Sequence, residues 1–154
     1  MVIYMSNKRK TVEFDEFLKF YSYLHGRMEF CDYWGDMGFE EGENMLKKFS
    51  DDDWNELKKI ITERISLWQE RLMDCLYVDE RGHAFEILLM LADTDDREVL
   101  YECCSLLLVF DEKSIKFFLS QKKEFLPKIK KIVDAENRPN SAISARYLEI
   151  CKLL

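Results

Sequence analysis

Apolar residues recur at intervals of three and four along most of this chain, which is the period of amphipathic helices. A first helix is predicted from Thr11, whose hydroxyl can cap it, to about Leu24. Its apolar stripe is expected to contain Phe14, Phe17, Leu18 and Tyr21. The sequence has only 5 Gly and 2 Pro, which favours helices over many short strands with tight turns.

The pattern becomes weaker between Arg27 and Phe49. A short helix is predicted around 28–34, and Gly35 and Gly38 predict a loop after it. A short helical turn is predicted at 43–49.

The clearest helix is predicted to run without interruption from Ser50 to about Leu76. Ser50 and Asp53 have the spacing of a capping box, and three carboxylates in the first turn suit the positive end of the helix dipole. The residues expected to face the core are Trp54, Leu57, Ile61, Ile65, Trp68, Leu72 and Cys75.

The next helix, at 84–92, is apolar on nearly every side and is therefore expected to be buried between neighbours. A tight turn follows at 93–96, where Asp95 and Glu98 predict a second capping box. The core residues expected in the helix after this turn are Val99, Cys103, Leu106 with Leu107, and Phe110.

Three further helices are predicted before the end of the chain. Asp111 is expected to cap the first, and Pro127 fits the first turn of the second, where its missing N–H costs nothing. Ser141 is expected to cap the last helix. Its inward residues are expected to be Ala142, Ala145, Leu148 and Cys151, or Leu148 with Ile150 and Leu154.

The second half of the chain is weakly self-similar. A helix that ends at Asp93 is followed by a turn and Val99, and a helix that ends at Asp134 is followed by a turn and Ile143. The shift from Val99 to Ile143 is 44 residues, within the range of HEAT and armadillo repeats. The turn from Leu91 to Val99 resembles the HEAT inter-helix turn, although Leu100 stands where Arg is common.

This resemblance covers about residues 82–154 and implies antiparallel helix pairs that form a short HEAT/armadillo-like α-superhelix. We therefore expect an all-α protein with one domain over 1–154. In this interpretation, 11–49 holds N-terminal helices and an acidic, aromatic segment, and 50–154 holds the HEAT-like helices.

The net charge of −7 is concentrated in one stretch. Nine acidic residues and two lysines lie between Glu29 and Asp53, so this stretch alone accounts for the whole net charge. An acidic chain is poorly suited to nucleic acid or an anionic membrane but suits a basic protein partner. A lysine-rich stretch could bind RNA, but we expect its members to pair with local acids or water: Lys122, Lys123, Lys128, Lys130 and Lys131.

The five cysteines are odd in number and lack the spacing of a disulfide framework, so they are interpreted as reduced core residues. The apolar part of the first ten residues is too short for a signal peptide, and the longest dense apolar run, 106–110, is far shorter than a membrane span. A cytoplasmic location without a membrane partner is expected.

No residue pattern indicates catalysis. His25 and His83 are far apart in the sequence and are interpreted as capping or packing residues. The chain has no Gly-rich phosphate loop and no zinc-ligand spacing, and Asp93, Asp95 and Asp96 lack the Gly and distal Glu of a calcium loop. We therefore expect no enzyme activity and no cofactor or metal site.

A partner-binding site is predicted in the acidic, aromatic segment. Its candidate residues are Asp32, Tyr33, Trp34, Asp36, Phe39, Glu40, Glu41 and Glu43. Trp and Tyr are frequent in interface hot spots, and carboxylates accelerate the encounter with a basic partner. Alternatively, the rings of Trp34 and Phe39 fasten the segment to the core. The carboxylates are assigned to the interface because burying them unpaired is costly.

The chain also resembles bacterial immunity proteins of polymorphic-toxin and contact-dependent growth inhibition systems, several of which are compact HEAT-like helical folds. The resemblance rests on size, acidity, the missing catalytic motif, and the sequence from Trp68-Gln69-Glu70-Arg71-Leu72 through Leu88-Leu89-Met90-Leu91-Ala92-Asp93. It implies a cognate toxin domain, often a basic nuclease, that is bound tightly in the cytoplasm with its active site occluded. A HEAT-like scaffold or adaptor protein is the alternative, and an enzyme with an unrecognised site is a third hypothesis.

Overall fold

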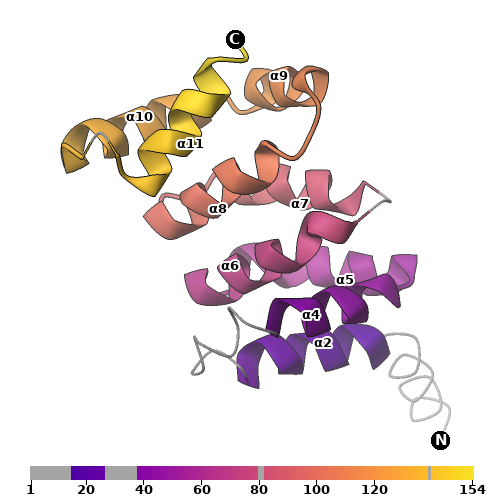
Figure 1. Cartoon of the computed structure of the whole chain (residues 1–154). Helices are drawn as coiled ribbons and strands as arrows, with labels where there is room; N and C mark the ends of the chain where they lie inside the picture. Colours follow the sequence, from indigo (N-terminus) through magenta and orange to yellow (C-terminus); the bar gives the residue numbers. More distant parts are fainter. Residues whose placement is uncertain (1–14, 27–37, 80–81, 139) are drawn as a thin grey trace, which may run out of the picture. The chain divides into compact units, whose positions relative to one another are not determined.

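The computed structural model describes residues 15–26, 38–79, 82–138 and 140–154 (Figure 1). These residues form nine α-helices and two 3₁₀ turns, and no strand occurs among them, so the all-α prediction is confirmed. The chain separates into two compact units, 1–83 and 84–154. The HEAT-like superhelix and the division of a single domain near residue 50 stay predictions.

The first unit contains four described α-helices: α2 (Asp15–Gly26), α4 (Phe39–Lys47), α5 (Asp51–Ile60) and α6 (Ser66–Cys75). Helix α2 packs on α4, α5 and α6, and α4 also packs on α6. Their shared core is aromatic. The Phe20 ring lies edge-on to Phe49 and Trp68, with ring centroids 5.6 and 6.4 Å apart, and Phe49 lies edge-on to Trp54 at 5.1 Å. The prediction that Trp54 and Trp68 belong to the core is confirmed, since each is 1% exposed.

The predicted stripe of α2 was partly wrong. Phe17 is buried as expected, but Phe20 and Leu24 are completely buried, whereas Leu18 is 44% exposed. Phe17, Phe20 and Leu24 also have the three-four spacing of a helix stripe. This stripe buries the Phe20 ring in addition to that of Phe17, so it removes more apolar area from water than a stripe through Leu18 would. The predicted cap Thr11 and the stripe residue Phe14 lie outside the described residues.

Helix α4 begins at Phe39, where the glycines predicted a loop and the helical turn was expected only from residue 43. Gly42 is buried in the middle of this helix. A Cβ placed on Gly42 would overlap the Cys75 Sγ of α6 and lie 3.6 Å from Phe20 Cε2. The glycine is therefore tolerated within a helix because it permits α4 to approach α6 closely, a tertiary reason that overrides propensity.

The uninterrupted helix predicted from Ser50 to Leu76 was also wrong. Helix α5 passes into a 3₁₀ turn, η2 (Ile61–Glu63), and Arg64 and Ile65 are extended, with ψ of 155° and 153°, before α6 starts. The β-branched residues around this point disfavour helix, and the Gln69 side-chain amide donates a 2.8 Å hydrogen bond to the Ile61 carbonyl. Ile65, expected in the core, is 62% exposed. A second 3₁₀ turn, η3 (Leu76–Val78), follows α6.

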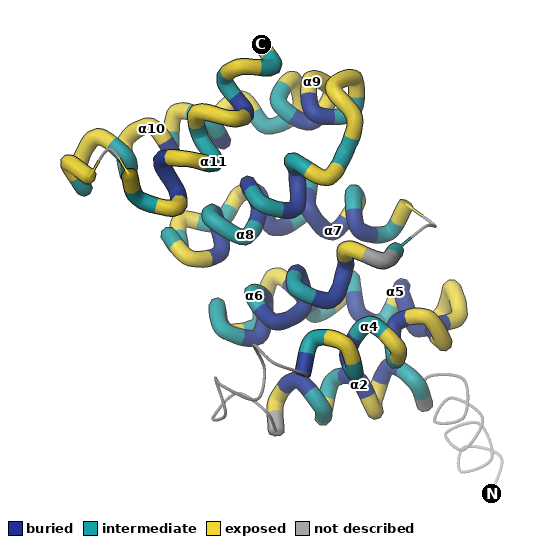
Figure 2. The backbone as a smooth tube through the Cα atoms, in the orientation of Figure 1, coloured by how far each residue is buried: buried dark blue, intermediate teal, exposed yellow. Residues whose placement is uncertain are grey.

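The second unit contains the helices α7 (His83–Leu91, of which His83 groups with the first unit), α8 (Arg97–Leu107), α9 (Glu112–Gln121), α10 (Phe125–Glu136) and α11 (Ala142–Cys151). Helix α11 packs on both α8 and α10. Figure 2 shows that these helices bury one side and expose the other. The fully buried residues include Ile87, Leu88, Val99, Cys103, Leu107, Phe118, Phe125, Ile129 and Ile143.

The predicted caps of this unit were mostly right. Asp111 caps α9 by accepting a hydrogen bond from Ser114 N, and Ser141 caps α11 by accepting one from Ser144 N. At α8, however, the cap is Asp96, whose Oδ1 accepts from Glu98 N and Val99 N at 3.0 and 3.1 Å. The cap therefore lies one residue later than predicted, and Asp96 N donates to the Thr94 hydroxyl within the turn. Asp95 instead lies 3.2 Å from Lys128 Nζ.

The predicted inward stripe of α11 was wrong as well. Ala142, Ala145, Leu148 and Leu154 are exposed, and Cys151 is half-buried. The buried residues are Ile143, Ser144 and Ile150, so of the alternative stripe only Ile150 was correct. No described helix has the length and apolar character that crossing a membrane requires.

Candidate functional site

The predicted partner site is described only in part. Asp32, Tyr33, Trp34 and Asp36 lie outside the described residues. The structure places the other four on α4, where Phe39 is half-buried, Glu40 is exposed, and Glu41 and Glu43 are half-buried. Their membership of an interface stays a prediction.

The start of α4 holds its carboxylates in a defined position. The Tyr23 hydroxyl of α2 donates a 2.7 Å hydrogen bond to the Gly38 carbonyl immediately before the helix. Glu40 and Glu41 follow in the first turn, where the positive end of the helix dipole stabilises negative charge. Partial burial raises the pKa of Glu43; Lys47 opposes this shift and Glu40 adds to it.

The start of α5 is more firmly fixed. Ser50 Oγ accepts from Asp53 N at 3.2 Å, and Asp53 Oδ2 accepts from Ser50 N at 2.8 Å, which confirms the capping box. Asp53 is 2% exposed and its Oδ1 also accepts from Phe17 N of α2 at 3.2 Å. Asp51 and Asp52 in the same turn are exposed. The buried Asp53 is thus structural, and its two neighbours project their charge from an anchored backbone.

The negative charge is distributed unequally between the units. Residues 1–83 contain eighteen acidic and twelve basic residues, and residues 84–154 contain twelve and eleven, so the net charges are −6 and −1. In the second unit, exposed carboxylates pair with cations across turns and along helices, as in Asp93–Lys122, Glu112–Lys116 and Asp134–Lys130. In the first unit, Glu40 and Asp52 have no ion-pair partner among the described residues.

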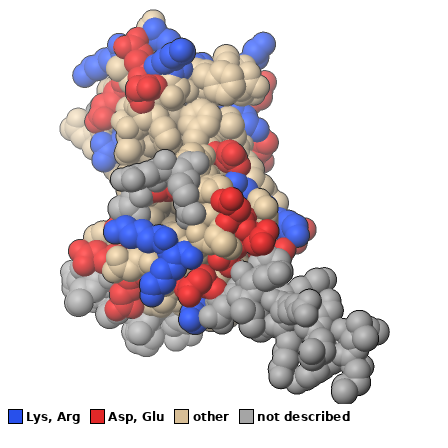
Figure 3. Space-filling view, turned by 90° about the vertical axis from the view of Figure 1, so that its right-hand side faces the viewer, with Lys and Arg blue, Asp and Glu red and all other residues tan. Residues whose placement is uncertain are grey.

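Acidic and basic side chains are intermixed on the surface. Figure 3 shows one face on which acidic and basic side chains both occur, with other side chains between them. Near α5, for example, Glu56 pairs with Lys59 at 2.7 Å. A partner would therefore meet local groups of carboxylates, such as those at the starts of α4 and α5, rather than a continuous negative surface.

The two histidines pack against aromatic rings, as the packing interpretation predicted. His25 stacks on Tyr21 with centroids 6.4 Å apart, and His83 stacks on Trp54 at 4.5 Å with an interplanar angle of 11°. His83 Nδ1 also lies 2.9 Å from Lys58 Nζ, and its Nε2 lies 4.0 Å from Asp51 Oδ1. These contacts hold the His83 side chain against α5, within the first unit.

The lysine-rich stretch largely pairs with nearby acceptors, as expected. Lys122 binds Asp93 at 2.9 Å, and Lys130 binds Asp134 at 2.8 Å along α10. Lys128 contacts Asp95 and donates to the carbonyls of Asp93 and Thr94. The bonds of Lys122 and Lys128 hold the start of α10 against the turn between α7 and α8, whereas the bond of Lys130 lies within α10.

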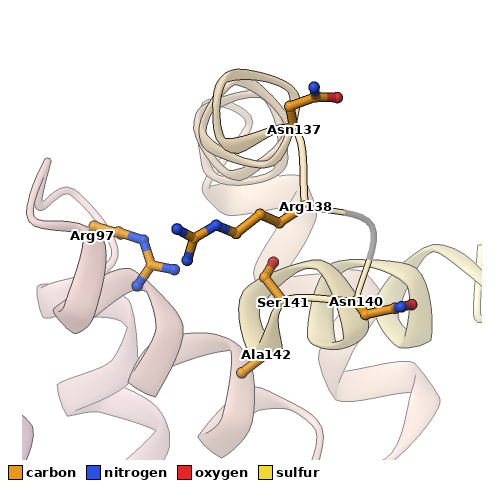
Figure 4. A pocket seen from close by; sticks show the side chains of 6 residues that line it. All are labelled: Arg97, Asn137, Arg138, Asn140, Ser141 and Ala142. Atoms are coloured by element: carbon orange, nitrogen blue, oxygen red, sulfur yellow. The ribbon is translucent and has the colours of Figure 1, made fainter.

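Sequence reasoning missed a shallow, open polar pocket on the surface of the second unit. It has a volume of about 610 Å³ and is lined by Arg97, Asn137, Arg138, Asn140, Ser141 and Ala142 (Figure 4). Residues 137–140 were predicted only as a turn. A long cationic side chain in a turn directly before a serine-capped helix was the one available signal, and it does not reveal that Arg97, distant in sequence, points to the same place.

The second unit also exposes several apolar side chains. Val109 and Phe117 are 55% and 53% exposed, respectively. Phe117 contacts the half-buried Phe85 with centroids 6.2 Å apart, and Phe85 also meets Phe110 edge-on at 5.3 Å. An aromatic cluster thus continues from the interior of this unit to its surface.

Comparisons with protein-family models, curated proteins and solved structures found no match to this chain. Among the described residues, no group of three or more His, Cys, Asp or Glu side chains is placed to hold a metal ion. Any functional assignment therefore rests on the charges, contacts and exposed surfaces described above.

Proposed function

We propose that this chain is an immunity protein, which binds a cognate toxin domain with a basic surface and neutralises it by occluding its active site. The observation that carries the proposal is the concentration of net charge in the first unit, −6 against −1 in the second. The toxin would act in the cytoplasm, often as a nuclease, and the immunity protein would meet it there.

The arrangement of the carboxylates suits rapid recognition. Glu40 and Asp52 occupy first turns of helices, are exposed, and have no ion-pair partner among the described residues. Charges of this kind steer a cationic partner over several ångströms and raise the association rate. Because the backbone at these helix starts is already fixed, little conformational entropy is lost on binding.

A nuclease would be a fitting target for such a surface. Its active site must attract phosphate groups and is therefore rich in Lys and Arg. Carboxylates on a folded inhibitor can occupy that basic surface and exclude nucleic acid. Inhibition then requires no chemistry from this chain, which agrees with the absence of a catalytic motif in its sequence.

The proposal is tested by purifying the tagged protein from its native host and identifying bound proteins by mass spectrometry. We expect a stoichiometric partner that is a toxin domain with a basic surface. Co-expression of that partner with this chain should restore the growth of cells that the partner alone kills. A stable partner whose toxicity is unaffected by co-expression would overturn the proposal.

A matched pair of variants locates the interface. Glu40→Lys with Asp52→Lys should slow association with the partner by about tenfold at low salt, and by less at physiological salt because of screening. Glu112→Lys with Glu124→Lys is the charge-matched control, since both residues lie at helix starts and are exposed but belong to the second unit. Equal association rates for the two variants would remove the starts of α4 and α5 from the interface.

A scaffold or adaptor protein is the second candidate function. The observation that favours it is the exposure of the apolar side chains Val109 and Phe117, which lie on the second unit and do not depend on the acidic residues. An adaptor needs two contact surfaces. In this case the purified complex would contain two partners, and Phe117→Ser would release one of them while the other stays bound.

A further inference from the structure

The imidazole of His83 lies between two oppositely charged side chains of α5. Lys58 Nζ is 2.9 Å from its Nδ1, and Asp51 Oδ1 is 4.0 Å from its Nε2. The ring also stacks on Trp54, with centroids 4.5 Å apart and an interplanar angle of 11°. The His83 side chain is only 15% exposed, whereas that of Asp51 is 89% exposed. A largely buried ring thus has one charged neighbour at each nitrogen.

The contact with Lys58 determines the state of the ring at neutral pH. A lysine ammonium has only donors, so Lys58 donates and His83 Nδ1 accepts. A ring nitrogen that accepts carries no proton, so the imidazole is neutral and its proton lies on Nε2. The 4.0 Å between Nε2 and Asp51 Oδ1 is too long for a hydrogen bond, so this carboxylate stays open to other cations.

Protonation of the ring reverses both relations. A proton on Nδ1 makes this nitrogen a donor, so it no longer accepts from Lys58, and two cations at 2.9 Å repel each other. The same positive charge attracts Asp51, whose mostly exposed side chain has room to move closer. The face of the Trp54 ring also stabilises a cation stacked on it.

We propose that His83 is a pH-sensitive switch: its neutral ring accepts a hydrogen bond from Lys58, and its protonated ring releases Lys58 and binds Asp51. The proton comes from the solvent in the mildly acidic range where histidines ordinarily titrate. The charged groups that meet the ring from the opposing helix are Lys58 and Asp51. The nearest charged residues along the chain itself are Asp79, Glu80, Arg81 and Glu86.

The switch would change the charge that the start of α5 presents to a partner. With a neutral His83, Asp51 is an open carboxylate beside Asp52, and with a protonated His83 it is paired. Resting on the proposed function, we expect mild acid to slow association with a basic partner. The switch itself belongs to the free chain, so it is tested without any partner.

The experiment is a pH titration of the isotopically labelled full chain, from about pH 8 to about pH 5, followed by nuclear magnetic resonance of the imidazole nitrogens. At the upper end, His83 should carry its proton on Nε2 only. The side-chain resonances of Lys58 and Asp51 should then shift at the same pH as the His83 nitrogens. His25, which is exposed and stacks on Tyr21, is the internal reference.

Variants of the two neighbours should move the titration midpoint of His83 in opposite directions. Lys58→Gln should raise it by about one pH unit, and Asp51→Asn should lower it by about half a unit. Lys59→Gln and Glu63→Gln remove exposed charges of the same unit and should each move it by less than about 0.2 unit. A proton on Nδ1 at pH 8, a ring still neutral at pH 5, or equal shifts in test and control variants would overturn the proposal.

Discussion

The effect of Gly42→Ala on the free energy of unfolding should depend on the residue at position 75. The substitution should destabilise the protein that has Cys75 and stabilise the protein that has alanine there. Gly42 lies in the middle of α4, where alanine has the higher helix propensity by about 1 kcal/mol. In the native core, however, the new methyl group would overlap Cys75 Sγ. The thiol has little freedom to move, because Cys75 is 0% exposed and its Sγ donates to the Arg71 carbonyl at 3.2 Å.

The magnitudes decide the sign in each background. Overpacking a core by one methyl group costs about 1–3 kcal/mol, and a severe overlap lies at the upper end of that range. Gly42→Ala alone should therefore lower the free energy of unfolding by about 1–2 kcal/mol. In Cys75→Ala the sulfur is absent, and the nearest atoms to the new methyl group are the residue-75 Cβ and Phe20 Cε2, both at 3.6 Å, which are ordinary contacts. There Gly42→Ala should stabilise by about 1 kcal/mol.

Urea unfolding of the four proteins in this cycle, followed by tryptophan fluorescence, measures the effect. Trp54 and Trp68 are buried in the same unit as Gly42, so their emission reports on the relevant core. The coupling energy between positions 42 and 75 should be about 2–3 kcal/mol in favour of the double variant. A Gly42→Ala substitution that stabilises the native protein, or that has the same sign in both backgrounds, would refute the close approach of α4 and α6.

Three further predictions concern other parts of the chain. Asp53→Ala removes the acceptor for Ser50 N and Phe17 N and should destabilise by about 2 kcal/mol in urea unfolding, whereas Asp52→Ala in the same turn should change stability by less than about 0.5 kcal/mol. The hydrogen bond from Arg97 lowers the pKa of the Glu136 carboxyl below its ordinary 4.5. The ionised carboxylate therefore stabilises the fold above pH 4.5, and this stabilisation is lost as the pH falls through the lowered pKa. Below about pH 5 the melting temperature of Glu136→Gln should therefore fall less steeply with pH than that of the original protein. Burial raises the pKa of Cys104 to about 12 and those of Cys75 and Cys103 well above the ordinary value, so alkylation at neutral pH, mapped by mass spectrometry, should modify half-buried Cys151 long before these three.

Local signals in the sequence predicted the caps and the best-defined core positions. Ser50, Asp111 and Ser141 cap helices because a side-chain oxygen directly before a helix meets a free N–H whatever the rest of the fold does. Trp54 and Trp68 were correctly placed in the core because large rings at helical spacing gain most from burial.

Features that depend on distant neighbours could not be read from the local pattern. Gly42 is accommodated within a helix because Cys75, on another helix, leaves no space for a Cβ. The break after η2 is completed by Gln69, whose amide reaches back to the Ile61 carbonyl. On α11 neither predicted stripe is the buried one, and only Ile150 was placed correctly; Ile143 and Ile150 face inward because they remove more apolar area from water than alanines do.

Of the two candidate sites, one could be found from the sequence and the other could not. The acidic residues of α4 were found from composition, since carboxylates concentrated in one stretch are visible without a fold. The pocket was not found, because Arg97 and Arg138 are separated by two complete helices and meet only when α8 and the turn before α11 are placed.

The boundary between the two units, at His83 and Ala84, has a consequence for folding during translation. Every residue of the first aromatic core, from Phe17 to Trp68, is synthesised before Ala84. That core can close around its own helices while the remainder of the chain is still being translated, since compact units generally fold in the order in which they emerge. Nascent chains would thus bury Phe17, Phe20, Phe49, Trp54 and Trp68 early, which shortens the time in which those rings could cause aggregation.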